Sequence, residues 1–194
     1  MKLAIMQPYF FPYIGYWQLL SAVDIFIIFD DVNFIKKGYI NRNSILVGEK
    51  SQTITLELLK ASQNKLINEI EVGSNSNKIL KTIAMAYGKA PNFKKIYPIL
   101  EDILENREKN LSKFIGYSLE KISDYLEMNT NFIFSSDIEK NNSLKAQDKI
   151  LNICEKLNAT EYINAIGGLE LYDEKFFNAK GINLNFLETE VVNY

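Results

Sequence analysis

The sequence predicts an α/β fold of the doubly wound type, with a mostly parallel five-stranded sheet and helices between its strands. Two observations carry this prediction. Short apolar runs of strand length end in polar residues, and segments with apolar residues at helical spacing separate these runs. The first two runs, 3–6 and 25–29, enclose a helical segment at 14–23 and so form a βαβ unit. The remaining strands are expected at 132–134, 162–163 and 182–187.

An insertion is expected between the second strand and the third. Apolar runs on both sides of Gly48 predict a hairpin of 43–47 with 52–58. Helical spacing of apolar residues then predicts three helices between 76 and 127. The sheet is therefore expected to carry a hairpin and helical insertion at about 44–127.

The rest of the chain is expected to belong to the same domain. Helices at 146–157 and 169–179 separate the last three predicted strands. No Pro-, Gly- or Ser-rich stretch divides the chain, so we predict a single α/β domain over residues 1–194. No apolar run approaches the ~20 residues that a membrane-spanning helix needs, and the first residues lack a signal-peptide pattern. We therefore expect a cytoplasmic protein without a membrane span.

Composition excludes several classes of function. The chain has no histidine, which removes the commonest general base and the commonest metal ligand, together with every Ser/His or Cys/His nucleophile pair. The single cysteine, Cys154, lies among apolar residues at helical spacing and is expected in the core. The net charge is -2 and the lysines are scattered among acidic residues, so nucleic acid is not expected as a partner.

Polar, aromatic or glycine residues follow four of the predicted strands, where a doubly wound sheet binds its ligands. Asp30 and Asp31 end the second strand, and a carboxylate there is costly unless it is paired, metal-bound or part of a site. We therefore interpret them as candidate catalytic residues that can act as a general base or hold Mg²⁺, with no other cofactor evident. Gly167 and Gly168 precede the last predicted helix, where main-chain amides can bind an anion. The other candidate substrate-binding residues at strand ends are Gln7, Ser135 and Asn164.

An aromatic loop follows the first strand. Residues 7–16 contain five aromatic side chains and two prolines, which form a stiff wall that can stack on a base or a sugar. The phenol groups of Tyr9, Tyr13 and Tyr16 need polar partners, so we interpret these three tyrosines as candidate substrate-binding residues. Phe10, Phe11 and Trp17 are expected to serve packing instead.

A segment rich in hydrogen-bond donors follows the two aspartates. Arg42 is one of two arginines in a chain whose basic residues are otherwise lysine, which points to planar, bidentate recognition of a phosphate or carboxylate. A surface ion pair with a glutamate is the alternative interpretation. The candidate substrate-binding residues of this segment are Asn33, Lys36, Lys37, Asn41, Arg42 and Asn43.

These motifs resemble the WbqC-like family of bacterial proteins over essentially the whole chain. The resemblance rests on Met6–Tyr16, on Phe29–Val32 with Asn41–Asn43, on Tyr87–Phe93 and on Tyr162–Tyr172. It implies a context of O-antigen, lipopolysaccharide or other surface-glycan biosynthesis, without naming a reaction.

The leading hypothesis is a transferase that moves a small group to or from a nucleotide-linked sugar, in particular an amino sugar. In this hypothesis Tyr9 and Tyr13 stack on the base or sugar, Arg42 with Lys36 or Lys37 holds the diphosphate, and an aspartate is the base.

Three alternatives remain open from the sequence. A narrower variant is nucleotidyl transfer, since a strand, an aromatic loop with Gly15 and a helix have the layout of HxGH nucleotidyltransferases. Both histidines of that motif are absent here. A second alternative is a non-catalytic binding or scaffolding subunit of a glycan-synthesis complex. The aromatic loop can also mediate formation of an oligomer.

Overall fold

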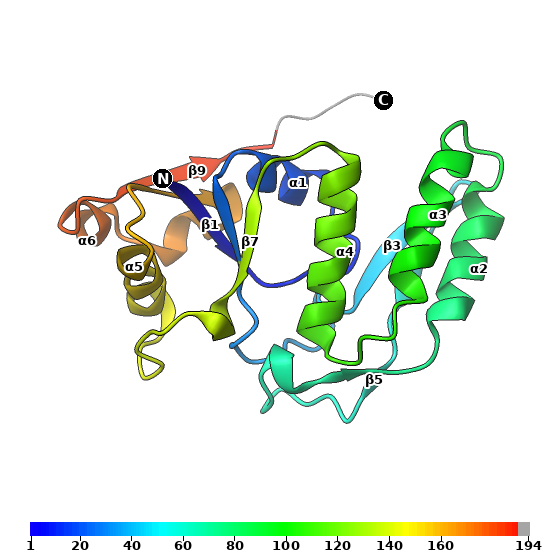
Figure 1. The fold of residues 1–194 in the computed structure, drawn as a ribbon, viewed down its shortest axis with the longest axis horizontal. Coiled ribbons are helices and arrows are strands. Elements are labelled where there is room, and N and C mark those ends of the chain that lie inside the picture. The colour runs from blue at the N-terminus through cyan, green and yellow to red at the C-terminus, as the bar shows by residue number, and fades with distance from the viewer. Residues whose placement is uncertain (190–194) are drawn as a thin grey trace. The chain divides into compact units, whose positions relative to one another are not determined.

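The computed structural model describes residues 1–189, and its central feature is a five-stranded parallel sheet (Figure 1). The strands lie in the order β7-β2-β1-β8-β9, and every neighbouring pair is parallel. This confirms the predicted doubly wound α/β fold, and the sheet is parallel throughout. The strands are β1 (Lys2–Met6), β2 (Ile25–Ile28), β7 (Asn131–Phe134), β8 (Glu161–Ala165) and β9 (Asn183–Leu187).

Helices cover both faces of this sheet because side chains alternate along each strand. On one face, Ile27 belongs to a buried cluster with side chains of α5 (Ala146–Lys156) and α6 (Glu174–Asn178). The preceding residue, Phe26, points to the other face, where its ring lies 5.2 Å from that of Tyr16 on α1 (Ile14–Ser21). Strands buried on both faces explain the continuous apolar runs of the sequence.

The strands β1 and β8 mark the point where the strand order reverses. They pair only through Lys2 with Glu161 and Leu3 with Tyr162, whereas β1 pairs with β2 over four residues. The carboxyl-terminal parts of β1 and β8 are therefore not hydrogen-bonded to each other. A crevice at this place is the usual ligand site of a doubly wound sheet.

The chain forms two compact units. Within residues 1–189, the sheet unit comprises 1–7, 13–29 and 128–189, and the hairpin unit comprises 8–12 and 30–127. The hairpin unit therefore contains the predicted insertion together with the two aspartates, the donor-rich segment and part of the aromatic loop. The single domain over 1–194 stays a prediction.

The hairpin unit contains the predicted hairpin and three helices (Figure 1). The hairpin turns more tightly than expected, because Val47 pairs with Lys50 and leaves a two-residue turn. Gly48 takes the first turn position with a φ of 61°, which glycine adopts without strain. The elements are β3 (Arg42–Val47), β4 (Lys50–Thr55), β5 (Leu58–Leu59), β6 (Glu71–Val72), α2 (Ser76–Tyr87), α3 (Phe93–Leu104) and α4 (Leu111–Tyr125).

The predicted helix at 169–179 is wrong in its extent. A 3-10 segment occupies Ile166–Leu171, and α6 begins only at Glu174. Asp173 starts the helix, because its carboxylate accepts a hydrogen bond from the Lys175 amide at 3.0 Å. Gly167 and Gly168 thus lie inside the 3-10 segment, so their predicted position at the N-terminus of the last helix is also wrong, and their role in binding stays a prediction.

Within residues 1–189, no helix combines the length and the apolar character that crossing a membrane requires.

Cys154 lies in the core, as predicted, with 0% of its surface exposed. Burial raises the pKa of its thiol to about 12, so almost no reactive thiolate forms at pH 8. We expect a disulfide reagent such as Ellman's reagent to leave the native protein unmodified at pH 8 and to titrate one thiol in concentrated urea. Rapid reaction of the native protein would contradict this placement.

Candidate functional site

Gln7 directly follows β1, where a doubly wound sheet usually binds its ligand. The main-chain carbonyl of Gln7 accepts a hydrogen bond from the Tyr16 hydroxyl at 3.0 Å. Tyr16 is 1% exposed, so this candidate residue belongs to the core and its hydroxyl fixes the main chain at the end of β1. Tyr13 lies in the same unit and is 54% exposed, so its ring is accessible to a ligand.

Asn164, at the end of β8, is buried and organises the segment that follows. Its Oδ1 accepts a hydrogen bond from the amide of Ala165 at 2.8 Å. A Cβ at Gly168 would lie 2.5 Å from the Asn164 Nδ2, so a larger residue there would have to displace the Asn164 side chain. Burial raises the pKa of Tyr172, and hydrogen bonds from Tyr162 and Asn164 partly offset this increase. Asn164 and Gly168 therefore form one contact, whereas Gly167 is exposed.

Ser135 lies at the end of β7 and is fully buried. Its Oγ has no hydrogen-bond partner within the described residues, and its main-chain carbonyl accepts a hydrogen bond from Lys140 Nζ. Lys149 of α5 lies in the same unit, 7% exposed, with its Nζ 5.2 Å from the ring centre of Phe29. Sequence reasoning missed both lysines, because a lysine near or in an amphipathic helix normally faces solvent and no pattern marks these two.

Asp30 opens the hairpin unit, and its carboxylate is 1% exposed. The Ser112 hydroxyl lies 3.2 Å from Asp30 Oδ2, and Asn110 caps α4 through bonds from the amides of Ser112 and Lys113. A carboxylate at a helix N-terminus is also favoured by the helix dipole. Asp30 therefore has a structural explanation as a buried, hydrogen-bonded carboxylate, whereas Asp31 is partly exposed.

The donor-rich segment contributes to one groove of about 350 Å³ in the hairpin unit. Four candidate residues predicted from the sequence line this basic groove together, and Glu57 supplies one opposing charge. The Glu57 carboxylate already accepts a hydrogen bond from the Ser74 amide at 2.9 Å. The lining residues are Phe34, Lys36, Lys37, Asn41, Arg42, Thr55, Leu56, Glu57, Leu58 and Ala61. Asp30 and Asp31 do not line the groove.

Within residues 1–189, Arg42 does not make the surface ion pair that was the alternative interpretation of its role. Its Nε donates to the carbonyl of Gly38 at 3.2 Å, and one Nη donates to the carbonyl of Lys37. A guanidinium has five N–H groups, so three remain for a ligand. Arg42 therefore fixes the loop that carries Lys36 and Lys37, and it also contributes positive charge to the groove.

The three asparagine candidates bond main-chain carbonyls. Asn33 Nδ2 donates to Gln63 at 2.8 Å, and Asn41 Nδ2 donates to Leu56 at 2.8 Å. Asn43 Nδ2 donates to the carbonyl of Phe11 at 2.6 Å and thereby holds the aromatic loop against β3. These side chains anchor segments of the hairpin unit.

Tyr9 also lies in the hairpin unit, where its ring centre is 5.8 Å from that of Tyr39. The rings are tilted by 54°, and Tyr39 is mostly exposed. The amide of Phe10 donates to the carbonyl of Tyr39 at 3.1 Å, which joins the two segments. Phe10 is fully buried, which confirms its predicted role in packing.

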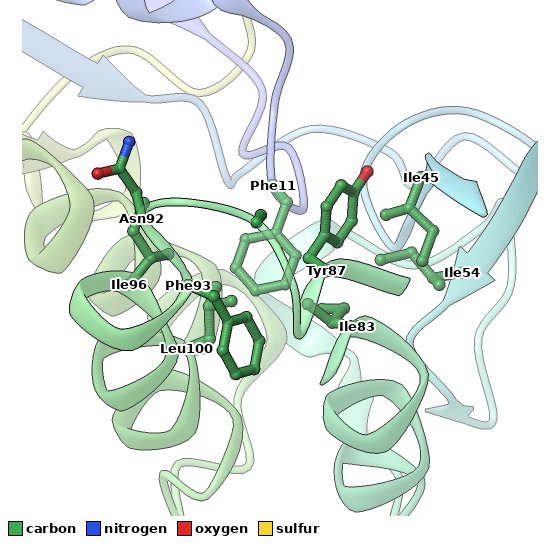
Figure 2. Close-up of a pocket in the computed structure, with 10 residues that line it drawn as sticks. Phe11, Ile45, Ile54, Ile83, Tyr87, Asn92, Phe93, Ile96 and Leu100 are labelled. Carbon is green, nitrogen blue, oxygen red and sulfur yellow. The ribbon is translucent and has the colours of Figure 1, made fainter. Parts of the chain in front are cut away.

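Sequence reasoning missed an apolar pocket of about 330 Å³ in the hairpin unit (Figure 2). Its helical residues recur at the spacing of an ordinary core face, so nothing in the sequence distinguished them from core residues. The apolar pocket is lined by Phe11, Ile45, Ile54, Ile83, Tyr87, Ala90, Asn92, Phe93, Ile96 and Leu100.

No three histidine, cysteine, aspartate or glutamate side chains gather into a metal-binding group within residues 1–189. A Mg²⁺ ion is commonly held by one or two carboxylates together with substrate phosphates. The role of Asp30 or Asp31 as a magnesium ligand therefore stays a prediction.

Comparison with known proteins decides the family. Residues 7–194 match the profile of the WbqC-like protein family. The chain belongs to the WbqC-like family. This WbqC-like protein is also similar to the uncharacterized protein Rv1507c of Mycobacterium tuberculosis. The two are 30% identical over 191 residues, which cover 96% of this chain and 82% of the relative. No solved structure matches the chain.

Replacing Ser112 by alanine tests the role assigned to Asp30 in this WbqC-like protein. The Ser112 hydroxyl lies between Asp30 Oδ2 at 3.2 Å and Asn110 Oδ1 at 2.8 Å, and loss of this shared donor is expected to lower the free energy of unfolding by about 1–3 kcal/mol. Urea unfolding monitored by circular dichroism measures this change.

Ser118 provides the matched control on the same helix. Its hydroxyl is also buried but has no hydrogen-bond partner among the described residues, so Ser118→Ala should change stability little. Equal effects of the two substitutions would show that the Ser112 hydroxyl does not support Asp30.

Proposed function

We propose that this WbqC-like protein is an enzyme of O-antigen or other surface-glycan biosynthesis. It transfers a small group to or from a nucleotide-linked sugar, in particular an amino sugar, and it binds the diphosphate of that substrate in the basic groove. The observation that carries this proposal is the presence of Lys36, Lys37, Asn41 and Arg42 in one groove of the hairpin unit.

The charge of the groove supports a diphosphate. Three cationic side chains face one carboxylate, and that carboxylate is engaged by the main chain at Ser74. Lysine ammonium groups bind phosphate as point charges, while the remaining N–H groups of Arg42 can bind phosphate oxygens in a planar arrangement. Because Arg42 already holds the main chain of the loop that carries both lysines, less main-chain entropy is lost when the ligand binds.

The parallel sheet supports the class of substrate. Its strand order, with β1 and β8 at the reversal, is the arrangement in which doubly wound folds bind nucleotides. In this proposal Asp31 is the general base, because Asp30 is buried and already hydrogen-bonded. Any Mg²⁺ ion would be shared between a carboxylate and the diphosphate.

A non-catalytic binding subunit is the second candidate function. One observation favours it: neither Asp30 nor Asp31 lines the basic groove. Such a subunit would bind the nucleotide sugar in the groove and turn over none of it.

Thermal shift with UDP-N-acetylglucosamine and related nucleotide sugars, with and without Mg²⁺, tests the proposal. A ligand present at a hundred times its dissociation constant should add about 2.7 kcal/mol to the apparent stability. We expect stabilisation of the native protein and a clear reduction in the double variant Lys36→Gln, Lys37→Gln. Arg42→Ala is unsuitable as the main test, because it also removes the bonds to Lys37 and Gly38.

Lys50→Gln is the matched control, since Lys50 is an exposed lysine of the same unit that lies outside the groove. It should bind as the native protein does. No stabilisation by any nucleotide sugar would contradict the proposal. Binding without turnover, in an assay of product formation with small-group donors, would favour the binding subunit.

A further inference from the structure

The apolar pocket has the properties of a ligand site. It is assembled from a hairpin, two helices and the aromatic loop, so elements distant in sequence meet around it (Figure 2). An apolar cavity of ~150 Å³ already accommodates a benzene ring. At about 330 Å³ this pocket lies within the size range of small-molecule sites and can take a longer hydrocarbon group.

The apolar pocket and the basic groove lie on opposite faces of the β3–β4 hairpin. Ile54 lines the pocket, and its neighbour Thr55 lines the groove. Successive side chains of a strand point to opposite faces, so the two sites cannot be one continuous surface across the hairpin. The pocket therefore needs a ligand of its own.

The start of α3 presents an apolar face that is incompletely covered. Phe93, Ile96 and Leu100 are each only partly buried, whereas Ile103 and Leu104 at the end of the helix are buried. These three residues line the pocket and follow the spacing of one helix face. An apolar ligand would cover this face and remove its surface from water.

The sequence that supplies the helical wall of the pocket is rich in lysine. The chain from Gly73 to Leu100, which includes α2 and the start of α3, contains five lysines and no aspartate or glutamate. Lys89, Lys94 and Lys95 are exposed and stand next to lining residues in the sequence. Within residues 1–189 none of these three makes an ion pair. Such an excess of positive charge, in a chain of net charge -2, favours an anionic partner.

We propose that the apolar pocket binds the hydrocarbon chain of a single-chain anionic amphiphile, whose phosphate head is attracted by Lys89, Lys94 and Lys95. The pocket wall itself is apolar, and the Tyr87 hydroxyl already accepts a hydrogen bond from the Leu46 amide at 2.9 Å. The hydrocarbon chain of the ligand supplies the apolar contact with the pocket. The charged phosphate head explains why the nearby sequence is rich in lysine. This site is separate from the basic groove and does not depend on nucleotide-sugar binding.

Isothermal titration calorimetry with n-decyl phosphate, below the concentration at which it forms micelles, tests this proposal on the full chain. We expect one molecule bound per chain and no binding of inorganic phosphate alone. Ala90→Phe places a ring in the pocket and should weaken binding about tenfold or more. A tenfold loss of affinity corresponds to leaving fewer than two methylene groups of the ligand unburied. The main-chain bonds at Ala90, to Tyr87 and Phe93, remain in this variant.

Ala179→Phe is the matched control, because Ala179 is an exposed residue of the sheet unit that lies outside the pocket. It should bind n-decyl phosphate as the native protein does. Circular dichroism and thermal unfolding of both variants establish that they are folded.

The role of the lysines is tested separately. The double variant Lys94→Gln, Lys95→Gln should bind n-decyl phosphate about threefold more weakly at low salt and bind neutral decyl maltoside unchanged. Lys78→Gln, at the far end of α2, should alter neither affinity. Absence of binding to folded protein, or equal binding by Ala90→Phe, would overturn the proposal. Binding only to phosphatidylglycerol vesicles would also overturn it, in favour of a membrane surface.

Discussion

The alternation of side chains along the β3–β4 hairpin is the constraint on which both candidate sites of the hairpin unit depend. Arg42 and Thr55 form one cross-strand pair, and Asn43 and Ile54 form the next. Adjacent pairs point to opposite faces. One face therefore carries the basic groove and the other carries the apolar pocket. A shift of the register by one residue would exchange these faces and destroy both sites.

Three asparagines and one arginine of the hairpin unit donate hydrogen bonds to main-chain carbonyls of irregular segments. Irregular segments lack the regular ladders that pair N–H and C=O groups, so other donors must satisfy their carbonyls. Asn43 donates a hydrogen bond to the carbonyl of Phe11, and Asn33 donates to the carbonyl of Gln63. Arg42 donates to the carbonyls of Lys37 and Gly38. A donor-rich segment can therefore indicate a well-anchored loop as much as a ligand site. In Arg42 the two roles coexist, because its guanidinium has more donors than the loop needs.

The aromatic loop illustrates how neighbouring residues of one motif acquire different roles. Tyr16 is buried against β2 in the sheet unit, whereas Phe11 belongs to the hairpin unit and lines the apolar pocket. Phe11 also has a φ of 46°, a left-handed conformation that is uncommon for a residue with a side chain. The bond from Asn43 to its carbonyl helps to maintain this conformation. The sequence pattern suggested the reverse, with Tyr16 as a candidate substrate-binding residue and Phe11 as a packing residue.

The sequence by itself determined the fold class, most of the elements, the core position of Cys154 and the family, because these depend on local periodicity and on motifs of adjacent residues. It also identified Lys36, Lys37 and Arg42 as a group, since they are close in the chain. It failed at the segment of Gly167 and Gly168, where Asp173 starts the helix later than apolar spacing implied. Only the tertiary structure decided that Asp30 is bonded to Ser112, which lies 82 residues away, and that helix residues such as Ile96 line a pocket. The physical reason is that an apolar helix face has the same spacing whether a neighbouring segment covers it or leaves it open, and only the packed chain shows which is the case.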